Sequence, residues 1–102
     1  MLVFLVRHAH ANPGEPDELR TLSARGQQEA EALAERLITH PTPPRVVLAS
    51  PLVRARQTAE HVTRATASEV RVDDRLAPGA TPAGLREAVE GLEGPVAAVG
   101  HQ

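Results

Sequence analysis

The sequence predicts an α/β fold: a three-layer αβα sandwich in which helices cover both faces of a mainly parallel sheet. The main observation is that short apolar runs alternate with amphipathic segments in the order β-α-β-α-β-α-β, which is typical of parallel strands joined by helices. The second observation is the length of 102 residues, which suffices for one small domain over residues 1–102. Hydrophobic residues make up 41% of the chain, and the predicted core is aliphatic because there is one Phe and no Trp or Tyr.

The first part of the chain contains one predicted strand, a loop and a helix. Residues 2–6 are continuously apolar, which predicts a strand buried on both faces. Residues 12–20, NPGEPDELR, are polar and contain Pro and Gly, so they predict a loop. Ser23 is the expected N-cap of a helix that ends near Thr39. The buried face of this helix is predicted from apolar residues at helical spacing: Ala30, Leu33, Ala34, Leu37 and Ile38.

The second part of the chain contains three further strands and two helices. Three short runs rich in β-forming residues predict the strands: residues 46–49, 69–72 and 96–99. Ser50-Pro51 predicts the start of the helix between the first two of these strands, with Ser50 as the N-cap and Pro51 in the first turn. Thr81-Pro82 repeats this pair and predicts the start of the last helix.

The composition argues against several classes of function. All eleven basic residues are Arg, so Schiff-base chemistry and the usual P-loop lysine are excluded. The chain has no Cys, which excludes thiolate catalysis and Cys-type zinc sites and fits a cytoplasmic protein. A net charge of -2 without a basic stripe argues against binding to nucleic acid or to an acidic membrane. The start, MLVFLVRHAH, does not resemble a signal peptide, and no segment approaches transmembrane length.

Basic and imidazole side chains follow three of the predicted strands. Arg7, His8 and His10 follow the first strand, Arg54 lies in the first turn after the second, and His101 follows the last. Because the carboxyl ends of parallel strands meet at one edge of a sheet, and ligands bind there, we expect these side chains to lie close together. The amino end of the helix that carries Arg54 adds partial positive charge. The sequence therefore predicts a site for an anion such as phosphate.

Two of these residues allow a different interpretation. His8 and His10 are two residues apart, so they can project from the same side of a strand and resemble a metal-binding pair. The sequence offers no evident third ligand, and we therefore interpret His10 as a residue of the pocket rim or of the solvent-exposed surface. We interpret Ser50 as a helix cap rather than a nucleophile, because it has no G-x-S-x-G setting.

Four motifs, taken in order and spacing, resemble the histidine phosphatase superfamily, also described as phosphoglycerate mutase-like. They are Arg7-His8 after the first strand, LSARGQQEA, SPLVRARQTA, and Gly100-His101 after the last strand. The RHA form with a following Ala11, the compact middle and the segment LAPGATP are most similar to the SixA-type branch of phosphohistidine phosphatases. The resemblance covers residues 1–102. It implies a domain that normally continues beyond the second histidine, so we expect this one to be truncated at its C-terminus.

The resemblance implies that His8 is the nucleophile and becomes transiently phosphorylated, while Arg7, Arg54 and His101 hold the phosphoryl oxygens. The residue types suit these roles. An imidazole with an ordinary pKa near ~6.5 is mostly neutral at pH 7, and neighbouring arginines lower that pKa further. The planar guanidinium group can bind two phosphoryl oxygens at once. No metal ion and no cofactor are implied, because protein cations neutralise the phosphoryl charge.

The general acid and the substrate are less clearly indicated. Larger family members have a Glu after the stretch that corresponds to residues 74–76. Here the stretch reads DDRLAPGATP, and it contains no carboxylate after Leu76. Asp17 and Glu15 are weak candidates for the acid, and Arg20 is a weak candidate for contact with substrate. The labile P–N bond of phosphohistidine depends less on a strong acid, so we expect protein phosphohistidine as the substrate. Three alternatives remain: a phosphatase of small phosphoesters, a non-catalytic phosphate- or phosphoprotein-binding remnant, and a metal-dependent hydrolase that uses His8 and His10.

Overall fold

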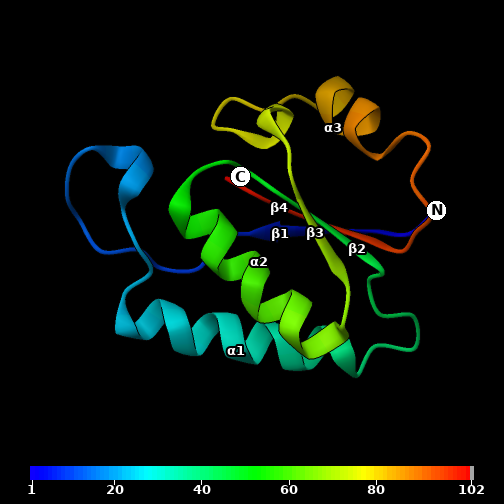
Figure 1. The fold of residues 1–102 in the computed structure, drawn as a ribbon, viewed down its shortest axis with the longest axis horizontal. Helices are drawn as coiled ribbons and strands as arrows, with labels where there is room; N and C mark the ends of the chain where they lie inside the picture. The colour runs from blue at the N-terminus through cyan, green and yellow to red at the C-terminus, as the bar shows by residue number, and fades with distance from the viewer. Residues whose placement is uncertain (102) are drawn as a thin grey trace.

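The computed structural model describes residues 1–101 and places a four-stranded parallel sheet at the centre of the molecule (Figure 1). The strands are β1 (Val3–Arg7), β2 (Val46–Ala49), β3 (Glu69–Val72) and β4 (Val96–Gly100), in the order β1-β4-β2-β3. The helices are α1 (Ala24–Ile38), α2 (Val53–Thr66) and α3 (Pro82–Val89), with short 3-10 turns η1 (Asp17–Leu19) and η2 (Asp74–Leu76). The predicted order of strands and helices is confirmed.

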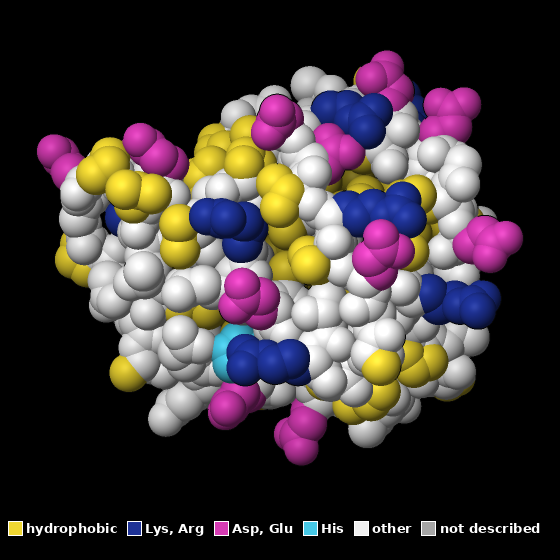
Figure 2. Space-filling model, viewed as in Figure 1, with side chains coloured by type: hydrophobic (Ala, Val, Ile, Leu, Met, Phe, Trp, Pro, Cys, Tyr) yellow, Lys and Arg dark blue, Asp and Glu magenta, His cyan; other side chains and the backbone are white. Residues whose placement is uncertain are grey.

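The sheet lies between two helical layers, so the predicted αβα sandwich is also confirmed (Figure 1). Helices α1 and α2 pack against one face, where Ala34, Ala55 and Val62 meet Val47 and Val99 of the strands. The turn η2 and helix α3 pack against the other face. On the side that α1 and α2 cover, acidic and basic side chains are interspersed (Figure 2). No helix within residues 1–101 is both long and apolar enough to cross a membrane.

Two of the three helices begin as predicted, and one does not. The Ser23 hydroxyl accepts a hydrogen bond from the Gly26 amide at 3.0 Å, and Thr81 caps α3 in the same way. The prediction that Ser50 caps α2 is wrong. This helix begins at Val53, and its N-cap makes no side-chain hydrogen bond. The chain first makes a turn after β2, and the Ser50 hydroxyl has other partners, described below.

The prediction that the first strand is buried on both faces is also wrong. Leu5 is 61% exposed and Leu2 is 44% exposed. The physical reason is the strand order, since β1 lies at one edge of the described sheet and pairs with β4. Leu5 lines an open, mainly apolar pocket of about 320 Å³ together with Leu76 and Leu85. The central strand β4, in contrast, is buried along its whole length.

Candidate active site

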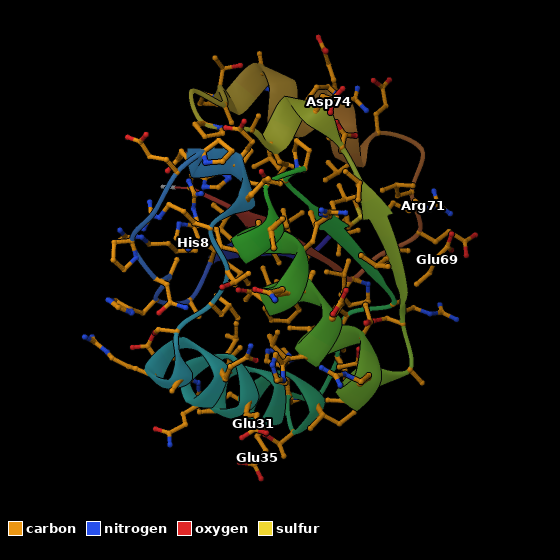
Figure 3. All side chains as sticks on the ribbon, turned by 60° about the vertical axis from the view of Figure 1, so that its left-hand side comes forward. His8, Glu31, Glu35, Glu69, Arg71 and Asp74 are labelled. Atoms are coloured by element: carbon orange, nitrogen blue, oxygen red, sulfur yellow. The ribbon has the colours of Figure 1, made fainter. Side chains whose placement is uncertain are left out.

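Three strands deliver polar residues to the same edge of the sheet. His8 follows β1, Ser50 follows β2, and His101 follows β4. Backbone hydrogen bonds hold these ends together: the His8 amide donates to the Gly100 carbonyl at 3.1 Å, and the Ser50 amide donates to Val99 at 3.0 Å. Figure 3 shows His8 beside the segment that precedes α1, on the opposite side of the molecule from β3. The sheet therefore fixes the backbone positions of His8 and His101.

The ring of His8 has a defined arrangement of protons. Its Nδ1 lies 2.7 Å from the Ala9 carbonyl oxygen, which can only accept, so Nδ1 carries the hydrogen. The Arg54 Nε–H group donates to Nε2 of His8 at 3.3 Å, which requires a lone pair on that nitrogen. The neutral ring therefore presents Nε2, with its lone pair, to the cationic edge of the sheet.

Burial and nearby charges favour the neutral form of His8. The pKa of His8 lies below its ordinary value of 6.5, chiefly because burial removes the ring from water. The hydrogen bond to the Ala9 carbonyl acts in the opposite direction and raises the pKa. Three positive charges lower it further: Arg54, Arg7 and Arg20. The ring is thus mainly uncharged at neutral pH.

Arg54 connects His8 with the loop that precedes α1. Arg54 is only 6% exposed and lies in the first turn of α2. Besides the contact with His8, Nη1 donates to the Asp17 backbone carbonyl at 2.9 Å, and Nη2 lies 3.2 Å from the Asp17 carboxylate. A buried guanidinium group with this planar geometry is well suited to hold a tetrahedral oxyanion next to the imidazole.

Asp17 is held as an anion. Its pKa is lowered first by the hydrogen bond from Arg20 and then by the bond from Arg54. These two bonds favour the ionised carboxylate, and the role of Asp17 as the general acid stays a prediction. Arg20 also donates to the Asn12 carbonyl at 2.8 Å, so it connects two points of this loop, Asn12 and Asp17.

His101 lies next to His8. The centroids of the two rings are 5.1 Å apart, with the ring planes tilted by 57°. The His101 Nε2 atom lies 2.6 Å from the Ser50 hydroxyl oxygen. Burial, followed by the positive charges of His8 and Arg54, lowers the pKa of His101 to about 4. The two neighbouring imidazoles are therefore both mainly neutral at neutral pH.

The remaining predicted site residues lie at or beyond the rim. Arg7 ends β1 as an exposed residue, and its charge acts on the pKa of His8. His10 is exposed and its Nδ1 lies 2.6 Å from the Ser23 hydroxyl, so it has a different partner from His8. Among residues 1–101, no three His, Asp or Glu side chains gather as a metal-binding group.

Two buried residues near the site have no role predicted from the sequence. The first is Thr58, which is fully buried one turn after Arg54. Its hydroxyl accepts from the Ala9 amide at 3.1 Å and donates to the Arg54 carbonyl at 2.8 Å. Thr58 thus links the segment that carries His8 to the helix that carries Arg54. One sequence signal could have indicated Thr58. It lies four residues after Arg54, and therefore on the same side of a helix that the apolar periodicity predicts to be packed against the sheet.

The second is Gly26, in the first turn of α1. A Cβ atom at this position would lie 1.9 Å from the carbonyl oxygen of His10. The same carbonyl accepts a hydrogen bond from the Ser23 amide at 3.0 Å. Only a residue without a side chain lets the segment after His8 lie this close to the helix. Gly26 therefore helps to set the position of the site without touching it.

Fold and side chains together define an α/β protein with a candidate site, centred on two histidines, at the carboxyl edge of its parallel sheet. Residues 3–78 match the histidine phosphatase superfamily (branch 1). The chain belongs to this family, and the resemblance stated on sequence motifs is confirmed. No curated protein matches the chain.

Solved structures of SixA proteins are similar over almost the whole chain. One, assigned as the phosphohistidine phosphatase SixA from Nakamurella multipartitia, is 29% identical, with a TM-score of 0.85 over 97% of this chain. Another, from Agrobacterium tumefaciens, is 31% identical, with a TM-score of 0.83 over 98%. A third, the protein histidine phosphatase SixA complexed with tungstate, is 28% identical, with a TM-score of 0.87 over 99%. The chain spans 58%, 68% and 69% of their respective lengths.

Proposed function

We propose that this domain is a phosphohydrolase that acts through a phosphohistidine intermediate on His8. The observation that carries the proposal is the state of the His8 ring. Its Nε2 has a lone pair because Nδ1 donates to the Ala9 carbonyl, and the buried Arg54 guanidinium contacts that same nitrogen. A nucleophile and a cationic oxyanion holder thus share one site, as covalent phosphoryl transfer requires. Family membership supports the same activity.

The proposed reaction has two displacements. In the first, the His8 Nε2 lone pair attacks phosphorus, and the bond to the leaving group breaks with its electron pair staying on that group. An imidazole leaves as a neutral ring when its other ring nitrogen already carries a proton. In the second, water attacks the phosphorus, the P–Nε2 bond breaks with its electron pair returning to the ring, and the proton of the attacking water passes to the solvent. Arg54, Arg7 and His101 hold the phosphoryl oxygens through both steps. The Ala9 carbonyl stabilises the ring while it carries positive charge.

Protein phosphohistidine is the substrate we propose. Asp17 is ionised by its two arginine partners, which leaves it poorly suited to protonate an alkoxide leaving group. The imidazole released from phosphohistidine is a better leaving group, because the ring nitrogen that is not bonded to phosphorus can already carry a proton when the P–N bond breaks. The name given to the solved SixA relatives agrees with this choice. We further propose that the reaction is independent of metal ions, since guanidinium groups supply the neutralising charge.

The test uses a histidine-phosphorylated protein and an aryl phosphate, each with and without a chelator. We expect phosphate release in the presence of chelator and a phospho-enzyme that is labile in acid and stable in base. His8→Ala should abolish both, whereas His10→Ala is the matched control and should retain them. Loss of activity with chelator and recovery with zinc would contradict metal independence. Tungstate binding without turnover of either substrate would favour the binding-module alternative.

A further inference from the structure

Ser50 is a buried hydroxyl for which the proposed reaction has no role. It is fully buried at the end of β2, directly beside the end of β4. Its oxygen has two polar partners among the described residues: the Leu52 amide at 3.3 Å and the His101 Nε2 at 2.6 Å. A hydroxyl in this position is not needed to cap α2, since that helix begins at Val53.

The directions of these two hydrogen bonds follow from the chemistry of the groups. The Leu52 amide can only donate, so the Ser50 oxygen accepts that bond. The hydroxyl hydrogen then has one remaining partner within the described part of the chain, the Nε2 of His101. A buried hydroxyl normally uses its hydrogen. Ser50 therefore donates to Nε2, which must present a lone pair.

This direction fixes the tautomer of His101. A neutral imidazole has one N–H group, and a lone pair on Nε2 places the hydrogen on Nδ1. The low pKa of His101 means that the ring is neutral at pH 7, so the position of this single hydrogen decides what the ring can do. With the hydrogen on Nδ1, the ring can donate to an oxyanion without being charged. With the hydrogen on Nε2, the single N–H group of the ring would donate to Ser50 and could not donate to an oxyanion.

We propose that Ser50 is a positioning residue that holds the proton of His101 on Nδ1, so that His101 donates a hydrogen bond to a phosphoryl oxygen. The inference rests on the proposed function for the identity of the oxyanion. It also accounts for a buried serine next to the second histidine.

The first measurement is made on the unmodified chain. Nitrogen-15 NMR of His101 at pH 7 should show a protonated Nδ1 and an unprotonated Nε2. The opposite pattern would overturn the inference without need of any variant. This readout does not depend on turnover, so a chain with the expected tautomer and no phosphatase activity would count against the proposed function and not against the role of Ser50.

The second measurement compares Ser50→Ala with Ser68→Ala. Ser68 is a half-buried serine at the opposite edge of the sheet, and its hydroxyl lies 2.6 Å from that of Thr66. We expect Ser50→Ala to move the His101 proton towards Nε2 and to weaken tungstate binding about tenfold, as the loss of one hydrogen bond would. Ser68→Ala should change neither. If Ser50→Ala leaves the tautomer and the tungstate affinity as they were, Ser50 does not have the proposed role.

Discussion

Arg54 is the residue that contacts the most parts of the candidate site. Its three guanidinium nitrogens contact His8, the Asp17 carbonyl and the Asp17 carboxylate. A lysine has a single ammonium group and cannot reproduce this planar set of donors. The contact with Asp17 also means that an incoming phosphoryl group has to share the guanidinium with an anion that is already bound.

Replacing Arg54 by Lys should therefore reduce kcat/KM for a phosphohistidine protein by about 100-fold or more, the usual effect of removing a preorganised donor. The matched control is Arg56→Lys, since Arg56 is an exposed arginine on the same helix. Steady-state kinetics of the two variants check the prediction. Equal activities of the two variants would mean that the planar set of donors of Arg54 takes no part in the reaction.

The protonation of His8 gives a second prediction at this scale. Its pKa lies below 6.5 through burial and through the charge of Arg54, so an NMR titration of the ring should find the midpoint below 6.5. Activity should fall as the pH drops through the same range, because protonation removes the lone pair of Nε2. In Arg54→Gln the midpoint should move upward, since one repulsive positive charge is gone. A downward movement would contradict this assignment of causes.

At the scale of elements, the close contact between α1 and the segment after His8 depends on Gly26. The nearest atoms to a Cβ at this position belong to the His10 backbone, which cannot rotate away as a side chain would. The helix start and the site are therefore coupled through one glycine. The contact between Thr58 and the Ala9 amide supports the same segment from the side of α2.

We predict that Gly26→Ala lowers the free energy of unfolding by roughly 1–3 kcal/mol, the usual cost of forcing extra volume into a packed contact. It should also lower kcat/KM, because the displaced segment carries His8. Gly84→Ala is the matched control: Gly84 occupies the same position in α3, and a Cβ there would lie 3.3 Å from a side-chain oxygen. Urea denaturation measures the free energy of unfolding of both variants, and steady-state kinetics measures their kcat/KM. A Gly26→Ala variant that is more stable than the unmodified chain would contradict the prediction, because it would show that the backbone around His10 can move to accommodate the methyl group.

The elements that the sequence predicted well are those with local signals. The caps Ser23 and Thr81 lie where expected because each satisfies an amide of its own helix. Ser50 was misassigned because a residue from the far end of the chain, His101, competes for its hydroxyl. The exposure of Leu5 depends on strand order, which no local pattern contains. For the same reason, the pairing of Asp17 with Arg54 could not be predicted from spacing.

For the whole molecule, the two histidines predict how stability depends on pH. Both have a pKa below 6.5 in the folded protein, and that of His101 is about 4. The unfolded chain takes up protons on these rings near pH 6.5, whereas the folded protein resists until lower pH. Their contribution is thus fully present above 6.5 and is lost as the pH falls towards 4.

Urea denaturation at pH 7 and pH 5 should accordingly show a lower free energy of unfolding at pH 5. In His101→Gln the difference between the two pH values should be smaller, because one of the rings that resist protonation has been removed. A chain that is equally stable at both pH values would show that the histidines are not shielded from protons as the structure indicates.

The pairing of β1 with β4 has a consequence for folding. His8 and His101 directly follow adjacent strands that are distant in sequence. Contacts of this kind close a long loop of chain, and they form slowly compared with local helices and turns. We therefore expect the site to form late in folding and to be lost early when β1 separates from β4. Tungstate affinity would then serve as a reporter of complete folding, sensitive to partly folded states that retain most of their helix content.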